Sequence, residues 1–206
     1  QYIQSRVDKT ETVEFETRPE EFNYTAYKTL AQKDEVVAIG ETGLDYYYME
    51  NERHPLNLAA DKITAIKKRQ EDVFIKQLKL AQELNKPTLI HCRQAHEDVL
   101  DILEGFCKNL PQPPLNLTED QHPSSPPFKG RNNSPPLISR RDWGELKGVI
   151  HSYSGRWSQA QRYLEMGFYI SFNGIITFCR DYDRVVCEAP LERILLETDC
   201  PYLTPM

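Results

Sequence analysis

The sequence predicts an α/β fold built on a parallel sheet, of the (β/α) barrel kind, and two observations support this. Short apolar runs typical of strands alternate along the chain with segments whose apolar residues recur at helical spacing. Four of these runs end in a carboxylate or imidazole side chain, at Glu41, His91, His151 and Asp199. Polar side chains at successive strand ends favour a barrel over an open doubly wound sheet. About five strands are visible, so the barrel is predicted to be incomplete compared with the roughly eight strands of a closed one.

Length and composition allow one moderate globular core. With 206 residues, of which 39% are hydrophobic, the chain is predicted to form a single domain over 1–206. No apolar run approaches the roughly 20 residues of a membrane span, so no membrane association is expected. Five scattered cysteines without a CxxC pair argue against a disulfide framework and favour the cytoplasm. The net charge of −6 gives no global attraction to polyanions, and no obligate protein partner is evident.

The chain before residue 92 is predicted to contain two strands, each preceded by a helix. Phe74 and Leu78 belong to an apolar stripe at helical spacing, and the helix stops at Asn85-Lys-Pro87 just before a strand. Gly43 is expected in a tight turn after the first strand. The expected elements, in order, are a weakly structured or helical opening to about residue 23, a helix over 24–32, a strand over 35–40, a helix over about 61–85 and a strand over 88–91.

A regular amphipathic helix and then a proline-rich segment follow. Ala95, Val99 and Phe106 lie on one apolar stripe with acidic residues facing away, which predicts a helix from about 95 to 107 packed on the sheet. Between about 108 and 144, proline is dense and mixed with Ser, Asn and Gln, a composition typical of linkers. This segment is predicted to be an exposed insertion whose basic residues are solvated rather than bound to a polyanion.

The last part of the chain repeats the alternation of strand and helix. Ser158 and Gln161 have the S-x-x-Q spacing of a capping box, and Gly167 is expected to end the helix that follows. Such alternation makes a parallel sheet with right-handed crossovers. The expected elements are a strand over 146–151, a helix from about 158 to 166, a strand over 168–172, a helix over about 182–187 and a strand over 193–198.

Four segments in order along the chain carry the polar strand ends. They are IGETGLDY at 39–46, PTLIHCRQAHED at 87–98, HSYSG at 151–155 and LETDCPYL at 196–203. Together they resemble the motifs of the TatD family of metal-dependent deoxyribonucleases, over roughly 36–205. Any one of these motifs alone would be a weak signal, but four in the same order are specific.

The resemblance implies a TIM-like barrel with one or two divalent ions at its C-terminal rim. Carried over to this chain, it implies that Glu41 bridges the two ions and that His91 and His151 hold one of them. Asp199 would hold the other and orient the attacking water as the catalytic carboxylate, with Arg93 nearby to bind substrate. Imidazole and carboxylate ligands suit Mg²⁺, Mn²⁺ or Zn²⁺, and a two-metal site can activate water while neutralising the charge of a phosphodiester.

One departure from the family pattern concerns its first strand. Members open with a His-x-His pair that completes the metal site, and no such pair occurs in this sequence. His54 and His122 fall in a loop and in the proline-rich insertion, so neither is expected to substitute for it. We therefore expect the sequence to be a fragment that lacks the His-x-His strand upstream and the C-terminal end of the domain.

The predicted ligands each have a purely structural interpretation as well. Glu41 alone could be a solvated strand end, and each of the two histidines could be a hydrogen-bonded histidine at a core rim. Asp199 could cap a turn before Cys200-Pro201. Two histidines at equivalent strand ends nevertheless favour metal ligation.

Other polar residues near these strand ends allow two interpretations. Glu197 either supports a metal ligand or is a buried charge that needs a partner. Arg93 is either a structural ion-pair partner or a clamp for phosphate. His96 is expected to be structural, and Cys92 and Cys200 are expected to act as small hydrophobes because no base pairs with them.

The leading hypothesis from the sequence is metal-dependent hydrolysis of DNA phosphodiester bonds, by exonucleolytic trimming of single strands or 3′ ends. A second hypothesis is another metal-assisted hydrolase of the same barrel, acting on an amide, lactone or aminoacyl ester, because the same ligands activate water whichever bond is broken. A third is a catalytically inert scaffold.

Overall fold

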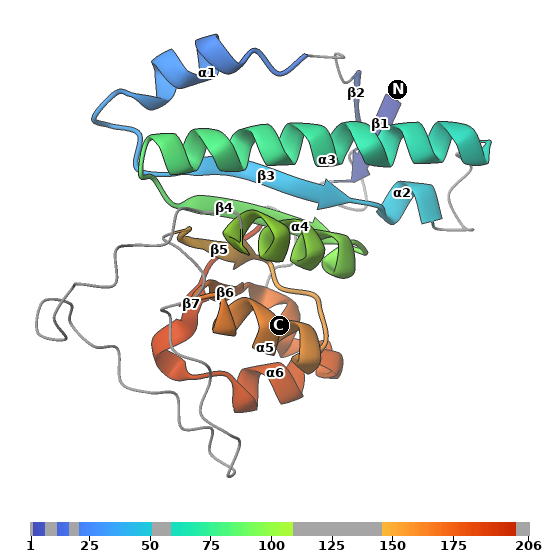
Figure 1. Ribbon diagram of the computed structural model, residues 1–206. Coiled ribbons are helices and arrows are strands. Elements are labelled where there is room, and N and C mark those ends of the chain that lie inside the picture. Colours follow the sequence, from blue (N-terminus) through green and yellow to red (C-terminus); the bar gives the residue numbers. More distant parts are fainter. Residues whose placement is uncertain (1, 7–11, 17–20, 51–58, 109–145, 201–206) are drawn as a thin grey trace, which may run out of the picture.

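The computed structural model describes residues 2–6, 12–16, 21–50, 59–108 and 146–200, and its centre is a five-stranded parallel sheet (Figure 1). Strands that follow one another in the sequence are neighbours in the sheet, so the order is β3-β4-β5-β6-β7. Their bounds are β3 Ile39–Asp45, β4 Thr88–Arg93, β5 Gly148–His151, β6 Tyr169–Phe172 and β7 Ile194–Leu196. The predicted α/β fold with about five parallel strands is confirmed. Among the described residues the sheet does not close into a barrel, and β3 and β7 are its edges.

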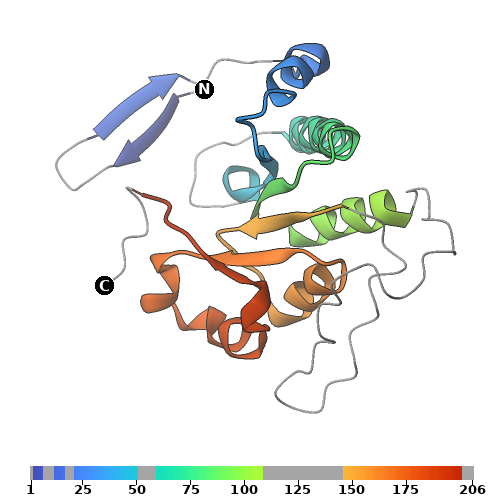
Figure 2. The same ribbon diagram turned by 90° about the vertical axis from the view of Figure 1, so that its left-hand side faces the viewer.

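Helices connect the strands and cover one face of the sheet, as Figures 1 and 2 show. Parallel neighbours require such crossovers because each strand must start again at the same end of the sheet. The α-helices are α1 Tyr24–Ala31, α2 Tyr47–Glu50, α3 Ala60–Glu83, α4 His96–Lys108, α5 Trp157–Glu165 and α6 Asp183–Glu188. Short 3₁₀ helices are η2 Gly174–Thr177, η3 Arg180–Tyr182 and η4 Leu191–Arg193.

Alternating burial along the strands separates a structural face of the sheet from a polar one. In β4, Ile90 and Cys92 are buried in the main hydrophobic core, whereas His91 and Arg93 are only half-buried. β5 repeats this, with Ile150 in the core and His151 half-buried. Because successive side chains of a strand point to opposite faces, the histidines lie on the face away from the helices.

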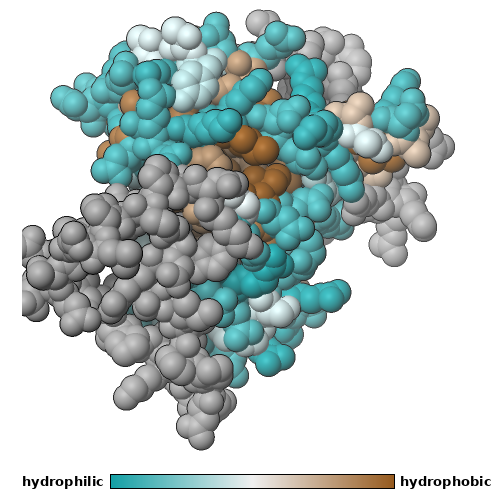
Figure 3. All heavy atoms as spheres, in the orientation of Figure 1, coloured by the Kyte–Doolittle hydropathy of each residue, from teal (hydrophilic) through white to brown (hydrophobic). Residues whose placement is uncertain are grey.

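The core between the sheet and the helices comes from the residues that helical spacing predicted. Phe74 and Leu78 of α3, Val99 and Leu103 of α4 and Tyr163 of α5 are fully buried. Full burial of each such side chain contributes about 1.5–3 kcal/mol. The face shown in Figure 3 is mostly hydrophilic, with hydrophobic side chains near the middle of the view and at its right-hand side. No helix among the described residues is both long and apolar enough to cross a membrane.

The first strand differs from the prediction. It was expected over 35–40 with Gly43 in a tight turn, but β3 begins at Ile39 and continues to Asp45. Gly43 lies inside the strand at a φ of +140°, and a Cβ there would stand 2.0 Å from the carbonyl oxygen of His91. Glycine is therefore needed because β4 approaches closely, which the single-sequence pattern could not distinguish from a turn.

The opening of the chain and the start of α5 also differ from expectation. Instead of a weakly structured or helical opening, β1 (Tyr2–Arg6) and β2 (Thr12–Glu16) pair as an antiparallel hairpin that is separate from the main sheet (Figure 2). α5 is capped at Arg156, whose backbone N–H donates to the side chain of Gln159, and not by the predicted Ser158 box. The predicted insertion at 108–144 lies almost wholly outside the described residues, as do His54 and His122.

Candidate metal centre

The C-terminal ends of the strands bring the predicted site residues together. His91 and His151 are paired in register across β4 and β5, and Gly43 of β3 is aligned with His91. Glu41 precedes this position at a register irregularity in β3. Asp199 follows β7, and its Oδ1 lies 2.9 Å from His151 Nε2. The structure thus brings Glu41, His91, His151 and Asp199 together at one end of the sheet.

His91 lies between two carboxylates of β3. Its Nδ1 is 2.8 Å from Glu41 Oε1, and its Nε2 is 3.2 Å from Asp45 Oδ2. Asp45 is held in turn by α3, because the Gln70 side chain accepts its backbone N–H at 2.9 Å and donates to its carbonyl at 3.1 Å. The prediction from the sequence did not include Asp45 among the site residues, although Asp45 belongs to the first motif.

Arg93 is an ion-pair partner in this structure. Its Nη2 donates to Asp45 Oδ2 at 2.7 Å, its Nε donates to both carboxylate oxygens at 3.1 Å, and its guanidinium lies over the ring of Tyr47. The side chain is still 40% exposed. The guanidinium is therefore fixed in orientation while part of it faces solvent.

His151 also lies between two carboxylates, both of which follow β7. Its Nδ1 is 2.6 Å from Glu197 Oε2, and its Nε2 is 2.9 Å from Asp199 Oδ1 and 4.0 Å from Glu41 Oε1. Glu197 also accepts the backbone N–H of Ser152. Of the two interpretations of Glu197, the structure supports the one in which it orients a predicted ligand.

Asn173 is a residue of this cluster that the sequence did not reveal. It follows β6, is almost fully buried, and donates from Nδ2 to Asp199 Oδ2 at 2.7 Å and to Ser152 Oγ at 2.6 Å. Its Oδ1 accepts the backbone N–H of Ile175 at 2.9 Å. A polar residue directly after a predicted strand was the available signal, but an Asn before Gly174 reads equally well as a turn.

The close carboxylates change the acid–base behaviour of the His91 half. Hydrogen bonds to Asp45 and Glu41 raise the pKa of His91 to about 9, and the bond with His91 lowers the pKa of Glu41. Burial alone would raise the pKa of Asp45, but hydrogen bonds with His91 and Arg93 lower it to about 2. The carboxylates of this half are thus ionised at neutral pH.

These contacts test whether the residues fit a divalent cation. Among the described residues, no group of three His, Cys, Asp or Glu side chains is already arranged as a metal site. Each histidine meets a carboxylate at both ring nitrogens, yet a neutral imidazole carries only one proton. A ring with a single proton would therefore have one contact between two acceptors, which either a second proton, favoured at His91 by its raised pKa, or a cation would relieve. The donor types fit Mg²⁺, Mn²⁺ or Zn²⁺.

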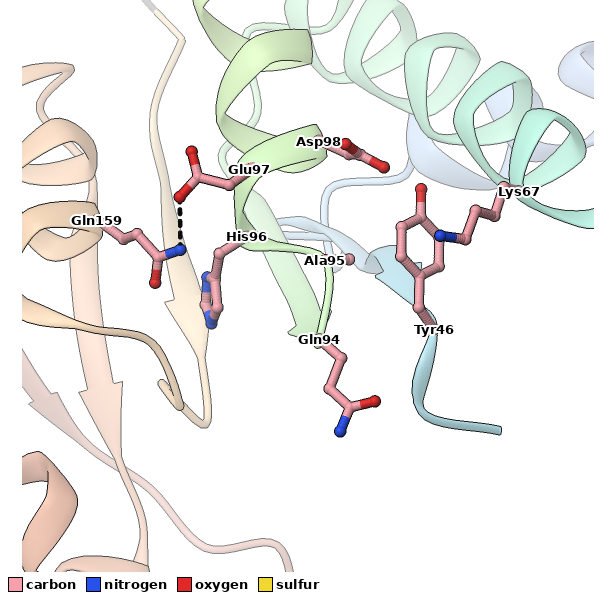
Figure 4. A pocket seen from close by; sticks show the side chains of 8 residues that line it. All are labelled: Tyr46, Lys67, Gln94, Ala95, His96, Glu97, Asp98 and Gln159. Atoms are coloured by element: carbon pink, nitrogen blue, oxygen red, sulfur yellow. Dashed lines mark hydrogen bonds between the residues drawn. The ribbon is translucent and has the colours of Figure 1, made fainter. Parts of the chain in front are cut away.

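A hollow of about 280 Å³ lies at the start of α4. Tyr46 and Gln94, which directly follow Asp45 and Arg93, are among its lining residues (Figure 4). Lys67 lies over the Tyr46 ring at 4.1 Å. None of the four predicted ligands lines the hollow.

The residues expected to be structural are placed as predicted where they are buried. His96 is buried between Tyr153 and Tyr163, and burial lowers its pKa to about 4. Cys92 is buried, and burial raises the pKa of its thiol to about 12. Cys200 is exposed, so its expected role as a small hydrophobe is wrong.

Comparison with known proteins gives one family. The model of the TatD related DNase family matches residues 9–206. The uncharacterized metal-dependent hydrolase YcfH of Escherichia coli K12 is 33% identical over 184 residues, which cover 87% of this chain and 50% of YcfH. The 3′-5′ ssDNA/RNA exonuclease TatD of Pantoea ananatis is 31% identical, over 86% of this chain and 51% of that protein. The chain thus spans about half the length of these relatives.

Solved structures are similar over the same part of the chain. The TatD homologue YjjV of Escherichia coli K12 has a TM-score of 0.57 and 25% identity, over 89% of this chain and 53% of that one. An uncharacterized amidohydrolase from Saccharomyces cerevisiae also has a TM-score of 0.57 and 25% identity, over 89% of this chain and 46% of that one.

Proposed function

The chain belongs to the TatD family, and from that premise we propose that it forms part of a metal-dependent hydrolase that cleaves DNA phosphodiester bonds from an end. The observation that carries the proposal is the pair of histidines, each held between two carboxylates at the C-terminal rim of the sheet. The exonuclease name of the similar Pantoea protein supports a single-stranded nucleic acid as substrate.

Four residues of this chain would hold one or two divalent ions. Glu41 would be a ligand shared by both halves of the site, because its Oε1 lies 2.8 Å from His91 Nδ1 and 4.0 Å from His151 Nε2. Asp199 would contribute Oδ1, since its other oxygen is occupied by Asn173. Bound metal would supply a nucleophilic water at neutral pH and offset the negative charge of the phosphodiester.

Other residues of the chain orient these ligands by hydrogen bonds. Glu197 accepts from Nδ1 of His151, which fixes the tautomer and leaves the Nε2 lone pair for a cation. Asp199 would orient the attacking water and accept its proton. Arg93 would contact a phosphate oxygen with the solvent-facing part of its guanidinium, while Asp45 and Tyr47 hold it in place.

A second candidate is a metal-assisted hydrolase acting on an amide or another ester. The similarity to a yeast protein described as an amidohydrolase favours it, and the ligand set would activate water for either bond. The two candidates differ in substrate but not in the residues that hold the metal.

A nuclease assay tests the proposal. We expect the purified protein with Mn²⁺ to shorten a 5′-labelled single-stranded oligonucleotide one nucleotide at a time, and Asp199→Ala to lower the rate by about 100-fold or more. Asp181→Ala, which removes an exposed carboxylate in η3, is the matched control and should keep the wild-type rate. Cleavage unaffected by Asp199→Ala would contradict the assignment. Activity limited to small amides or esters would favour the second candidate.

A further inference from the structure

The Asp199 carboxylate belongs to a closed ring of polar contacts that includes two residues with no role in the proposed chemistry. Starting from the backbone N–H of Ser152, the contacts run through Glu197, His151, Asp199 and Asn173 and return to the Ser152 hydroxyl. The ring joins the ends of β5, β6 and β7. Each of these five residues contacts two others of the ring.

Asn173 is the rigid member of this ring. The residue is only 4% exposed, and its Oδ1 is fixed by the N–H of Ile175 at the start of η2. With Oδ1 committed, the amide must direct both of its Nδ2 hydrogens away from η2. The acceptors there are Asp199 Oδ2 and Ser152 Oγ.

Ser152 has an unusual backbone that serves this arrangement. Its φ of +47° lies in the left-handed region, which is uncommon for a residue other than glycine. This conformation directs the N–H to Glu197 while the hydroxyl accepts from Asn173. Ser152 thus ties the partner of His151 to the partner of Asp199.

From this geometry we propose that Asn173, supported by Ser152, is a positioning residue that selects which oxygen of Asp199 faces the metal centre. The inference rests on the proposed function, because Asp199 must be a ligand for the selection to matter. Asn173 occupies Oδ2 and so fixes the carboxylate with Oδ1 beside His151 Nε2. A carboxylate free to rotate would have to be ordered when a cation binds, and the free energy that this ordering costs weakens binding.

The test replaces Asn173 without changing its shape. Asn173→Asp keeps an oxygen for the Ile175 N–H but puts a second oxygen against Asp199 Oδ2 in place of the donor. We expect roughly 10- to 100-fold weaker Mn²⁺ binding to the whole protein by calorimetry, and a similar fall in kcat with little change in KM for DNA. Asn173→Ala removes the donor without adding charge and should act in the same direction, so it serves if the Asp variant does not fold.

A matched control lies two residues away on β6. Ser171 is buried and donates to the carbonyl of Ile150 outside the ring, so Ser171→Ala should keep wild-type Mn²⁺ affinity and kcat. Asn173 variants that melt earlier but bind Mn²⁺ and turn over like wild type would overturn the positioning role. A wild-type protein that neither binds Mn²⁺ nor cleaves DNA would overturn the proposed function itself, and that result appears before any variant is made.

Discussion

The two histidines of the site have immediate neighbours of the same kind but different surroundings. His91 and His151 are paired in register, and each lies between two carboxylates. The contacts of His91 lead outward to Arg93, which is 40% exposed, whereas those of His151 lead inward to the buried Asn173. One half of the centre is thus open and rich in charge, and the other is closed by neutral hydrogen-bond donors.

This difference suggests that the open half contacts the substrate and that the closed half holds the metal ligands in place. In the proposed reaction, Arg93 of the open half would contact the phosphate, because its guanidinium is both oriented and accessible. The closed half has few alternative arrangements, since its carboxylates already accept defined hydrogen bonds. We expect substitutions where β3 and β4 meet to lower the stability of the fold, and substitutions around His151 to weaken metal binding.

The largest expected effect concerns the open half, through Gly43. Gly43→Ala should lower the free energy of unfolding by about 3 kcal/mol or more, because the new Cβ would overlap the His91 carbonyl at a φ of +140°. Gly105→Ala is the matched control, because a Cβ there meets no atom within 4 Å in the α4 helix. It should leave the protein unchanged or more stable by up to about 1 kcal/mol. Denaturant unfolding of both variants measures the difference, and equal stabilities would refute the close approach of β4.

The next effect concerns the closed half. Glu197→Gln keeps the size of the side chain but removes the charge that fixes His151, so Mn²⁺ affinity should fall roughly 10- to 100-fold. The control is Glu192→Gln, an exposed residue in η4. Calorimetric titration of Mn²⁺ measures both. Unchanged affinity in Glu197→Gln would mean that the closed half does not depend on this carboxylate.

A third histidine, outside both halves, separates acid effects on the fold from those on the site. His96 is buried and its pKa of about 4 lies below the unfolded value of 6.5, so only the unfolded chain gains its proton as the pH falls between these values. Its contribution to stability is fully present above pH 6.5 and lost progressively toward pH 4, about 2 kcal/mol between pH 7 and pH 5. His96→Phe should remove this part of the pH dependence in denaturant melts. A profile identical to wild type would show that His96 is not the responsible group.

The accuracy of prediction from the sequence depended on whether a signal was local. The helices α3 and α4 were found because residues such as Phe74, Leu78 and Val99 repeat at the helical period. The extent of β3 was not predicted correctly, because a glycine such as Gly43 is typical both of a turn and of a strand that a neighbouring strand approaches closely. Likewise, the β1–β2 hairpin contains no turn motif that distinguished it from a polar helix.

The chemistry of the candidate site followed the same division. By itself, the sequence determined which side chains end the strands, and thus that Glu41, His91, His151 and Asp199 could share a rim. Only the tertiary structure decided which atoms meet, such as Asn173 with Asp199, 26 residues apart, and Asp45 with Arg93, 48 apart. The periodicity of a strand depends on residues that are neighbours in the sequence. Hydrogen-bond partners depend instead on how separate strands align, and packing of the whole sheet sets that register.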